Sequence, residues 1–241
     1  MCRPLLRFDN CLNDALRKER VFMARSKSAS NWEQYSHKQM AALAEADLAA
    51  QAYALGLSLD GDGRVRASLF GRDYLVSNND IVSQDGAPVS TNHKSILAHY
   101  LPSRGEGRLS GEFLPIGRLT GMIDTGLSPG DSLIKPLTEK FGDKYPAFME
   151  AARKIDGQPE GKSPSGGESW LFSPLPKLRM RVIFFEADEE FEAEVKVLFD
   201  TSAPVFVAYE CLELLEMVLV AELLGSAGLL GCGGSCGHRH D

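Results

Sequence analysis

The chain has 241 residues, of which 44% are hydrophobic and 24% charged, a composition typical of a globular protein with a sizeable core. Its formal net charge of -7 argues against a nucleic-acid partner, because an acidic surface repels phosphate. The odd cysteine count and the lack of an apolar leader segment argue against a secreted disulfide framework. The longest apolar run, residues 211–230, contains glutamates, which argue against a membrane span. These features favour a cytoplasmic protein.

Residues 1–32 are expected to form a basic arm ahead of the folded body. Residues 1–40 contain eight lysines and arginines and four acids, so they carry a net charge of +4 and the remainder carries -11. Such an arm would dock on the acidic body or on an acidic partner. The stretch Met23-Ala24-Arg25-Ser26 resembles a translation start, and we hypothesise that residues 1–22 are an over-called start. An intact mass that includes Met1 would contradict this hypothesis.

Residues 33–57 are predicted to form one helix, with Asn31 as its N-cap and Gly56 as its C-terminal stop. Apolar residues recur there with helical spacing: Trp32, Tyr35, Met40, Leu43 and Leu48. Residues 65–76 alternate between apolar and polar and predict a hairpin or short meander, with Gly71-Arg72-Asp73 as the turn. Residues 60–63, Asp-Gly-Asp-Gly, lack the glutamate that a calcium loop carries at its twelfth position, so they predict a turn.

The middle of the chain predicts mainly helices. Residues 91–101 form a helix capped by Thr91 or Asn92, residues 112–116 are extended, and residues 129–141 and 146–155 form two further helices. The glycines of residues 105–111 do not fit a nucleotide-binding loop, because no strand precedes them and their spacing is wrong. Residues 157–169 are rich in Gly, Pro and Ser and predict a surface loop or hinge.

The last third predicts a hairpin of residues 178–185 and 191–199, followed by a helix over residues 209–224. The strands occur in hairpins and do not alternate with helices. The sequence therefore predicts an α+β fold, with a mainly antiparallel sheet built from hairpins and helices packed on it. We expect one domain over residues 33–224 and a Gly/Cys/His-rich tail over residues 225–241.

Four short stretches resemble an uncharacterised prokaryotic family, the domain-of-unknown-function family 3786. They are Ile96-Leu97-Ala98-His99-Tyr100-Leu101, Lys135-Pro136-Leu137 with Phe141-Gly142, Asp188-Glu189-Glu190-Phe191, and Val197-Leu198-Phe199-Asp200. The resemblance covers roughly residues 33–224. Relatives occur in anaerobes, and some are joined to an iron–sulfur-binding segment of the kind found with corrinoid proteins. The resemblance implies an accessory role near metal cofactors and implies no catalytic residues. This chain departs from it by lacking a four-cysteine cluster motif.

The tail carries a candidate metal site outside the region of resemblance. Its predicted ligands are Cys232, Cys236, His238 and His240. Two thiolates and two imidazoles suit a tetrahedral zinc or nickel ion, and the tail glycines permit tight folding. An iron–sulfur cluster is less favoured, because it would need further thiolates from Cys2, Cys11, Cys211 or a second subunit. The alternative is a tail that binds metal only in the test tube.

Other chemistry-bearing residues have structural explanations. Six carboxylates crowd residues 186–194; a solvated turn is favoured there over convergence of Asp188 and Glu190 on a hard cation or a basic partner. His37, His93 and His99 are assigned structural roles, and Cys211 a buried thiol. Arg179 and Arg181 are expected to pair with acids of the next strand.

These observations favour a non-catalytic accessory protein of anaerobic metal-cofactor metabolism, with a protein partner and a metal-binding tail. One alternative is a small-molecule enzyme whose site joins Lys135, His99 and the acidic turn. Another is a protein-interaction module with an incidental tail. The sequence assigns no catalytic residue, no cofactor-binding residue in the body, and no oligomeric state.

Overall fold

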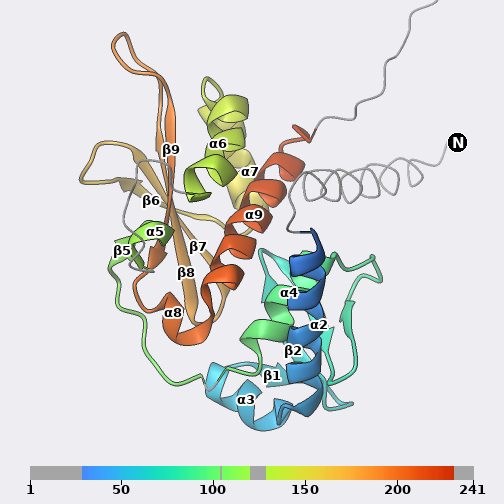
Figure 1. Ribbon diagram of the computed structural model, residues 1–241. Helices are drawn as coiled ribbons and strands as arrows, with labels where there is room; N and C mark the ends of the chain where they lie inside the picture. Colours follow the sequence, from blue (N-terminus) through green and yellow to red (C-terminus); the bar gives the residue numbers. More distant parts are fainter. Residues whose placement is uncertain (1–28, 104, 120–128, 231–241) are drawn as a thin grey trace, which may run out of the picture.

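The computed structural model describes residues 29–103, 105–119 and 129–230 (Figure 1). In these ranges the chain forms eight helices and two antiparallel sheets, so the predicted α+β class is confirmed. The helices are α2 (Ala29–Glu45), α3 (Leu48–Leu55), α4 (Thr91–Tyr100), α5 (Ile116–Leu119), α6 (Pro129–Phe141), α7 (Tyr145–Lys154), α8 (Ala203–Phe206) and α9 (Tyr209–Ser226).

The first sheet has four strands in chain order, β1 (Ser58–Leu59), β2 (Val65–Leu69), β3 (Arg72–Val76) and β4 (Ile81–Ser83). The second has five strands in the order β5-β9-β8-β7-β6. They are β5 (Phe113–Leu114), β6 (Gln158–Lys162), β7 (Glu168–Leu175), β8 (Leu178–Phe185) and β9 (Glu194–Asp200).

The first predicted helix is two helices in the structure. The chain breaks between α2 and α3, where Asp47 accepts a hydrogen bond from the Ala50 N–H and caps α3. The Asn78 side chain, from the turn before β4, donates to the carbonyls of Leu43 and Ala46 and closes the end of α2. The prediction of Asn31 as a cap is wrong, because Asn31 lies inside α2. Gly56 ends α3 with φ +73°, as predicted.

The predicted hairpin of residues 65–76 is confirmed, but its turn is Phe70-Gly71, because Arg72 and Asp73 already belong to β3. Val65 pairs with Val76 and Leu69 with Arg72, and the turn residues Phe70 and Gly71 both have positive φ, at 49° and 76°. The Asp60 carboxylate accepts the backbone N–H groups of Asp62 and Arg64, so this motif closes a turn, as expected.

The five-stranded sheet contains two strands that the sequence did not predict. Residues 157–169 were expected to be a loop, but they include β6 and the start of β7. All five residues of β6 are exposed, and Pro159 is tolerated because β6 is an edge strand. The C-terminal hairpin is confirmed, although β9 begins at Glu194 and Phe191 is 69% exposed.

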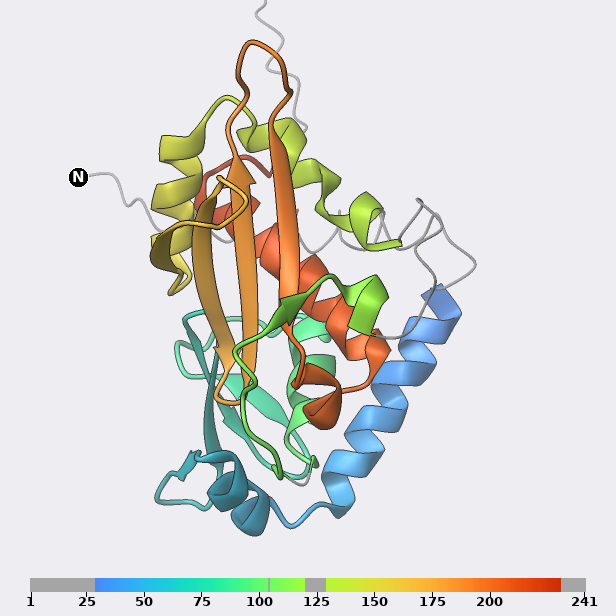
Figure 2. The ribbon, with the colours of Figure 1, turned by 90° about the vertical axis from the view of Figure 1, so that its left-hand side faces the viewer.

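Helices cover one face of the five-stranded sheet. Figure 2 shows β6 to β9 toward the viewer, with α6, α7 and α9 behind them. The even-numbered residues of β8 face these helices and are buried, whereas Arg179, Arg181 and Phe185 on the other face are partly exposed. One core cluster joins buried residues from both sheets and from α9. Helix α9 therefore lies at the centre of the fold and is packed against α4, α6 and α7.

Candidate functional site

Helix α4 carries two histidines, and each links a tyrosine to α9. The first is His93, which is 7% exposed. Its Nδ1 lies 2.5 Å from the Oη of Tyr74 on β3, and its Nε2 lies 3.5 Å from Oε1 of Glu222 on α9. Arg72, also on β3, donates through Nη2 and Nε to Oε2 of Glu222 at 2.8 and 3.2 Å. These four side chains join the four-stranded sheet, α4 and the end of α9.

The partners of His93 determine its proton positions. A carboxylate can only accept, so Nε2 carries the hydrogen toward Glu222 and Nδ1 accepts the Tyr74 O–H. Burial and, to a smaller extent, the nearby Arg72 charge lower the pKa of His93 to about 4. Burial likewise raises the pKa of Tyr74. The imidazole and the phenol are therefore both neutral near pH 7.

This Tyr74–His93–Glu222 arrangement resembles the order of groups in a proton relay, but Tyr74 is 3% exposed. A nucleophile or general acid must reach its substrate within hydrogen-bonding distance. The Tyr74 hydroxyl is instead directed at His93 inside the protein. We conclude that these groups fix α9 against the sheet.

The second histidine, His99, lies at the other end of α4. Its Nε2 accepts the backbone N–H of Ala208, the residue that precedes α9, at 3.0 Å. Its Nδ1 lies 2.7 Å from the Oη of Tyr35 on α2. Burial lowers the pKa of His99. The negative charge of Glu210 acts to raise this pKa, and the positive charge of Lys38 acts to lower it. Burial also raises the pKa of the neighbouring Cys211 thiol, which is fully buried as predicted.

A third polar cluster surrounds Asp200, which is 1% exposed at the end of β9. Its Oδ1 accepts the backbone N–H and the hydroxyl of both Ser110 and Ser202, at 2.6–3.1 Å. Its Oδ2 accepts the Gly111 N–H at 2.8 Å. Burial alone would raise the pKa of Asp200, but these hydrogen bonds outweigh it and lower the pKa to about 2. The carboxylate is therefore ionised, and the hydrogen bonds that its two oxygens accept join the loop before β5 to the end of β9.

A surface groove of about 380 Å³ lies between α2, the turn before β4 and the start of α4. Its lining residues are Glu33, Ser36, His37, Met40, Asn79, Asp80, Thr91 and Lys94. Within it the Lys94 ammonium pairs with the Asp80 carboxylate at 3.0 Å. The volume falls in the size range of small-ligand pockets.

The predicted metal ligands Cys232, Cys236, His238 and His240 lie outside the described residues. Across residues 29–103, 105–119 and 129–230, no group of three or more His, Cys, Asp or Glu side chains is placed to hold a metal ion. In the same ranges no helix combines the length and the apolar character that a membrane crossing requires.

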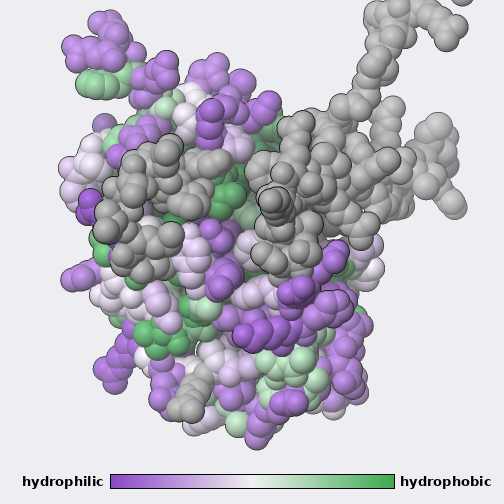
Figure 3. Space-filling view, viewed as in Figure 1, coloured by the Kyte–Doolittle hydropathy of each residue, from purple (hydrophilic) through white to green (hydrophobic). Residues whose placement is uncertain are grey.

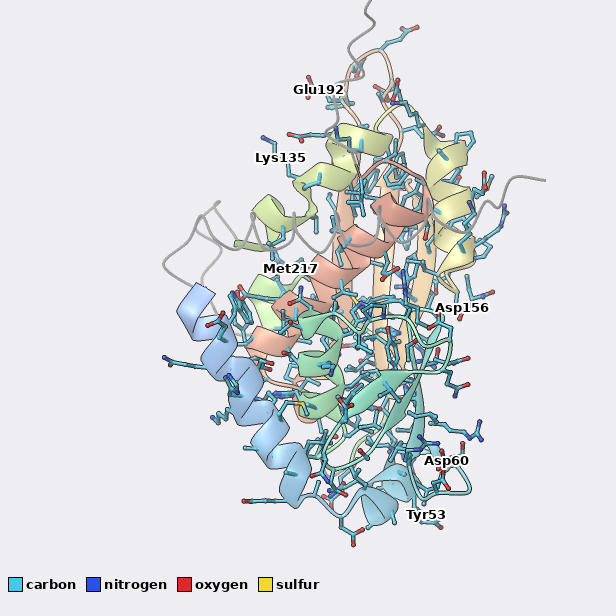
Figure 4. All side chains as sticks on the ribbon, turned by 90° about the vertical axis from the view of Figure 1, so that its right-hand side faces the viewer. Tyr53, Asp60, Lys135, Asp156, Glu192 and Met217 are labelled. Atoms are coloured by element: carbon cyan, nitrogen blue, oxygen red, sulfur yellow. The ribbon has the colours of Figure 1, made fainter. Side chains whose placement is uncertain are left out.

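The structure does not bring together the residues of the hypothetical enzyme site. Lys135 is exposed on α6 and pairs with Glu139 at 3.5 Å, whereas His99 contacts Tyr35 and Ala208. Figure 4 shows Lys135 on α6 and Glu192 at the projecting end of the β8–β9 hairpin. In that turn Asp188 accepts the backbone N–H groups of Glu190 and Phe191, which fits the solvated turn. Figure 3 shows this projecting end as mainly hydrophilic.

The expected pairing of Arg179 and Arg181 with acids of β9 is wrong. Arg181 forms two hydrogen bonds to Glu160 of β6, at 2.7 and 2.9 Å, and its guanidinium lies 3.9 Å from the ring centre of Phe113. Arg179 donates to the carbonyls at positions 176 and 178. The physical reason is the register of the two strands. The residue opposite Arg181 on β9 is Leu198, which carries no charge, and Glu194 of β9 forms an ion pair with Lys196.

Comparison with known proteins identifies the chain. A family model described as "Domain of unknown function (DUF3786)" matches residues 47–222. The chain belongs to this family. The resemblance expected from the sequence is therefore confirmed, and the matched region of the DUF3786 chain runs from the start of α3 to Glu222. No curated protein and no solved structure matches the chain.

The sequence did not reveal the partners of His93, His99 and Asp200. Arg72 and Glu222 are 150 positions apart, and His99 and Ala208 are 109 apart. The hydrophobic periodicity of α4 and α9 does not indicate such pairs. Periodicity shows which face of a helix is buried, but it does not show which element packs against that face. One available signal was Glu222, one of three glutamates within the long apolar run of residues 211–230.

Proposed function

We propose that this DUF3786 protein is a non-catalytic accessory protein of anaerobic metal-cofactor metabolism, acting with corrinoid or iron–sulfur systems. In this proposal the folded body binds a protein partner in the cytoplasm, and the C-terminal tail binds a zinc or nickel ion. The metabolic assignment is supported by what the family resemblance implies. The metal is assigned to the tail because Cys232, Cys236, His238 and His240 supply a complete set of four donors.

The observation that carries the non-catalytic role is how the buried polar groups of the body are used. His93 and His99 each contact a tyrosine and α9, and Asp200 accepts five hydrogen bonds. A catalytic acid, base or nucleophile must face a substrate. His93 and Asp200 are instead engaged inside the protein, and the half-buried His99 is engaged by Tyr35 and Ala208, so all three fix the helices and loops that form the surface.

Energetics favour a transfer site over a permanent structural site in the tail. Ordering the nine residues 232–240 costs about 1–2 kcal/mol per residue, and metal binding must offset this cost. Permanent sites gain affinity from neighbouring groups that orient the imidazoles. The tail glycines favour easy release, so the ion is expected to exchange with a competing chelator.

We expect the full-length protein, purified without a tag under anaerobic conditions, to contain close to one equivalent of zinc or nickel by elemental analysis. The double variant Cys232→Ser/Cys236→Ser is expected to lose at least nine-tenths of this metal, because serine is a poor ligand for these ions. His37→Ala is the matched control, since His37 is an exposed histidine of the body and should not change metal content. An equal metal content in all three proteins would refute the tail site.

A second measurement separates transfer from structural binding. A chromophoric chelator should remove the metal rapidly and leave the far-ultraviolet circular dichroism and the urea midpoint of the body unchanged. If metal removal unfolds the body, the ion is structural and the transfer role is wrong.

A further inference from the structure

The start of α9 is held by a histidine from another helix. Position 208, the N-cap of α9, is an alanine, which has no side-chain acceptor, and Tyr209 and Glu210 follow it. The N–H of Ala208 itself donates to Nε2 of His99 at 3.0 Å. This bond joins the end of α4 to the corner between α8 and α9.

The bond requires one tautomer of neutral His99. Nε2 must present its lone pair to Ala208, so Nδ1 carries the hydrogen and donates to the Tyr35 Oη at 2.7 Å. If Nε2 of His99 were protonated, its N–H and the N–H of Ala208 would face each other at 3.0 Å with no acceptor between them, and they would repel. Protonation would also place a positive charge at the positive end of an 18-residue helix.

We propose that His99 is a pH-sensitive latch, which holds the α8–α9 corner against α4 and α2 while it is neutral and releases the corner when it is protonated. The released state loses the Ala208 bond and retains the Nδ1–H bond to Tyr35. The apolar contacts of α9 with α4, α6 and α7 persist, so the change is a local opening and not global unfolding.

The groups around His99 set the direction of the response. Tyr35 and Lys38 face it from α2, and Glu210 and Cys211 belong to the first turn of α9. Burial and Lys38 disfavour the charged imidazole, whereas Glu210 favours it. The pKa of His99 in the folded protein is therefore lower than in the unfolded chain. Its contribution to stability is present above the unfolded pKa and is lost as the pH falls through the folded pKa.

The other histidine of α4 responds differently. His93 has its Nε2 3.5 Å from the Glu222 carboxylate, so a charged His93 would gain an ionic partner while losing the Tyr74 bond. Burial lowers the pKa of His93 to about 4, so His93 is almost entirely neutral above pH 5. The His99→Gln variant separates the response of His99 from that of His93 at lower pH.

The test is amide hydrogen exchange of the full-length protein from pH 7.5 to below the measured titration midpoint of His99, corrected for intrinsic exchange rates. The protection of the Ala208 amide is expected to fall by about tenfold on acidification, consistent with the loss of one hydrogen bond and an added repulsion. His99→Gln offers an amide oxygen that accepts from Ala208 and does not titrate, so its protection should be independent of pH. His37→Gln, at an exposed histidine, should behave as the wild type.

A direct titration keeps the proposal testable if His99→Gln fails to fold. Nitrogen chemical shifts of the wild-type imidazole should show an unprotonated Nε2 at pH 7, and its protonation should share a midpoint with the loss of Ala208 protection. Constant Ala208 protection, a protonated Nε2 at pH 7, or unchanged pH dependence in a folded His99→Gln variant would each overturn the proposal.

Discussion

Replacing Phe148 with alanine is expected to lower the free energy of unfolding by about 3–5 kcal/mol. Phe148 is 0% exposed on α7 and lies at the centre of an aromatic cluster. Its ring centre lies 5.6 Å from that of Phe141, 6.2 Å from Tyr145, 6.1 Å from Trp170 and 5.1 Å from Phe184. Alanine would remove every one of these contacts and leave a cavity between α7 and the five-stranded sheet.

Urea denaturation followed by tryptophan fluorescence measures this loss, because Trp170 is part of the same cluster. Phe191→Ala is the matched control: it removes the same atoms from a ring that is 69% exposed, so its effect should stay within about 0.5 kcal/mol. Equal destabilisation by the two variants would contradict the position of Phe148 in the core.

Replacing Asp200 with alanine is expected to cost about 2–4 kcal/mol. The substitution would leave the N–H groups of Ser110, Gly111 and Ser202 without their acceptor, and each unsatisfied buried donor costs about 1–3 kcal/mol, reduced where water enters. The affected bonds hold the loop before β5 against the end of β9. Hydrogen exchange should therefore show faster opening of residues 110–114 than of the β7–β8 ladder.

The pH dependence of the same carboxylate gives an independent test. The pKa of Asp200 is lowered to about 2, so its contribution is fully present above the unfolded value near 4 and is lost as the pH falls toward 2. Asp200→Ala should lack this part of the acid sensitivity. Asp188→Ala, in the exposed turn, is the control and should retain it. If Asp200→Ala shows the full wild-type loss between pH 4 and 2, other carboxylates cause that loss.

The parts of the fold that the sequence predicted are those with local signals. The β2–β3 hairpin follows from alternation and Gly71, and α6 and α7 follow from helical periodicity within one residue of their observed bounds. The prediction of one helix over residues 33–57 missed the break between α2 and α3. The N-cap Asp47 is a local signal for this break, whereas Asn78, which closes the end of α2, lies more than 30 positions away. Strand β6 was missed because an exposed edge strand carries no apolar alternation.

The polar clusters could not be predicted for a related reason. His93 and His99 are six positions apart on α4, and the sequence shows no partner for either. Their partners lie on β3, α2 and the α8–α9 segment, and tertiary packing brings these together. The predicted tail ligands have the opposite character, because they are close in sequence and their spacing alone suggests the chemistry.

The pairing of β5 with β9 has a consequence for how the chain folds. Phe113 pairs with Asp200, which completes the five-stranded sheet, and Arg72 on β3 reaches Glu222 on α9, so both contacts join distant parts of the chain. Such long-range contacts slow folding, because a large loop must close before they form. During synthesis α4, α6 and α7 emerge before α9 and expose the apolar surfaces that pack against α9 in the folded protein. We therefore expect slow refolding, and a fragment ending before α9 should aggregate unless a chaperone binds it.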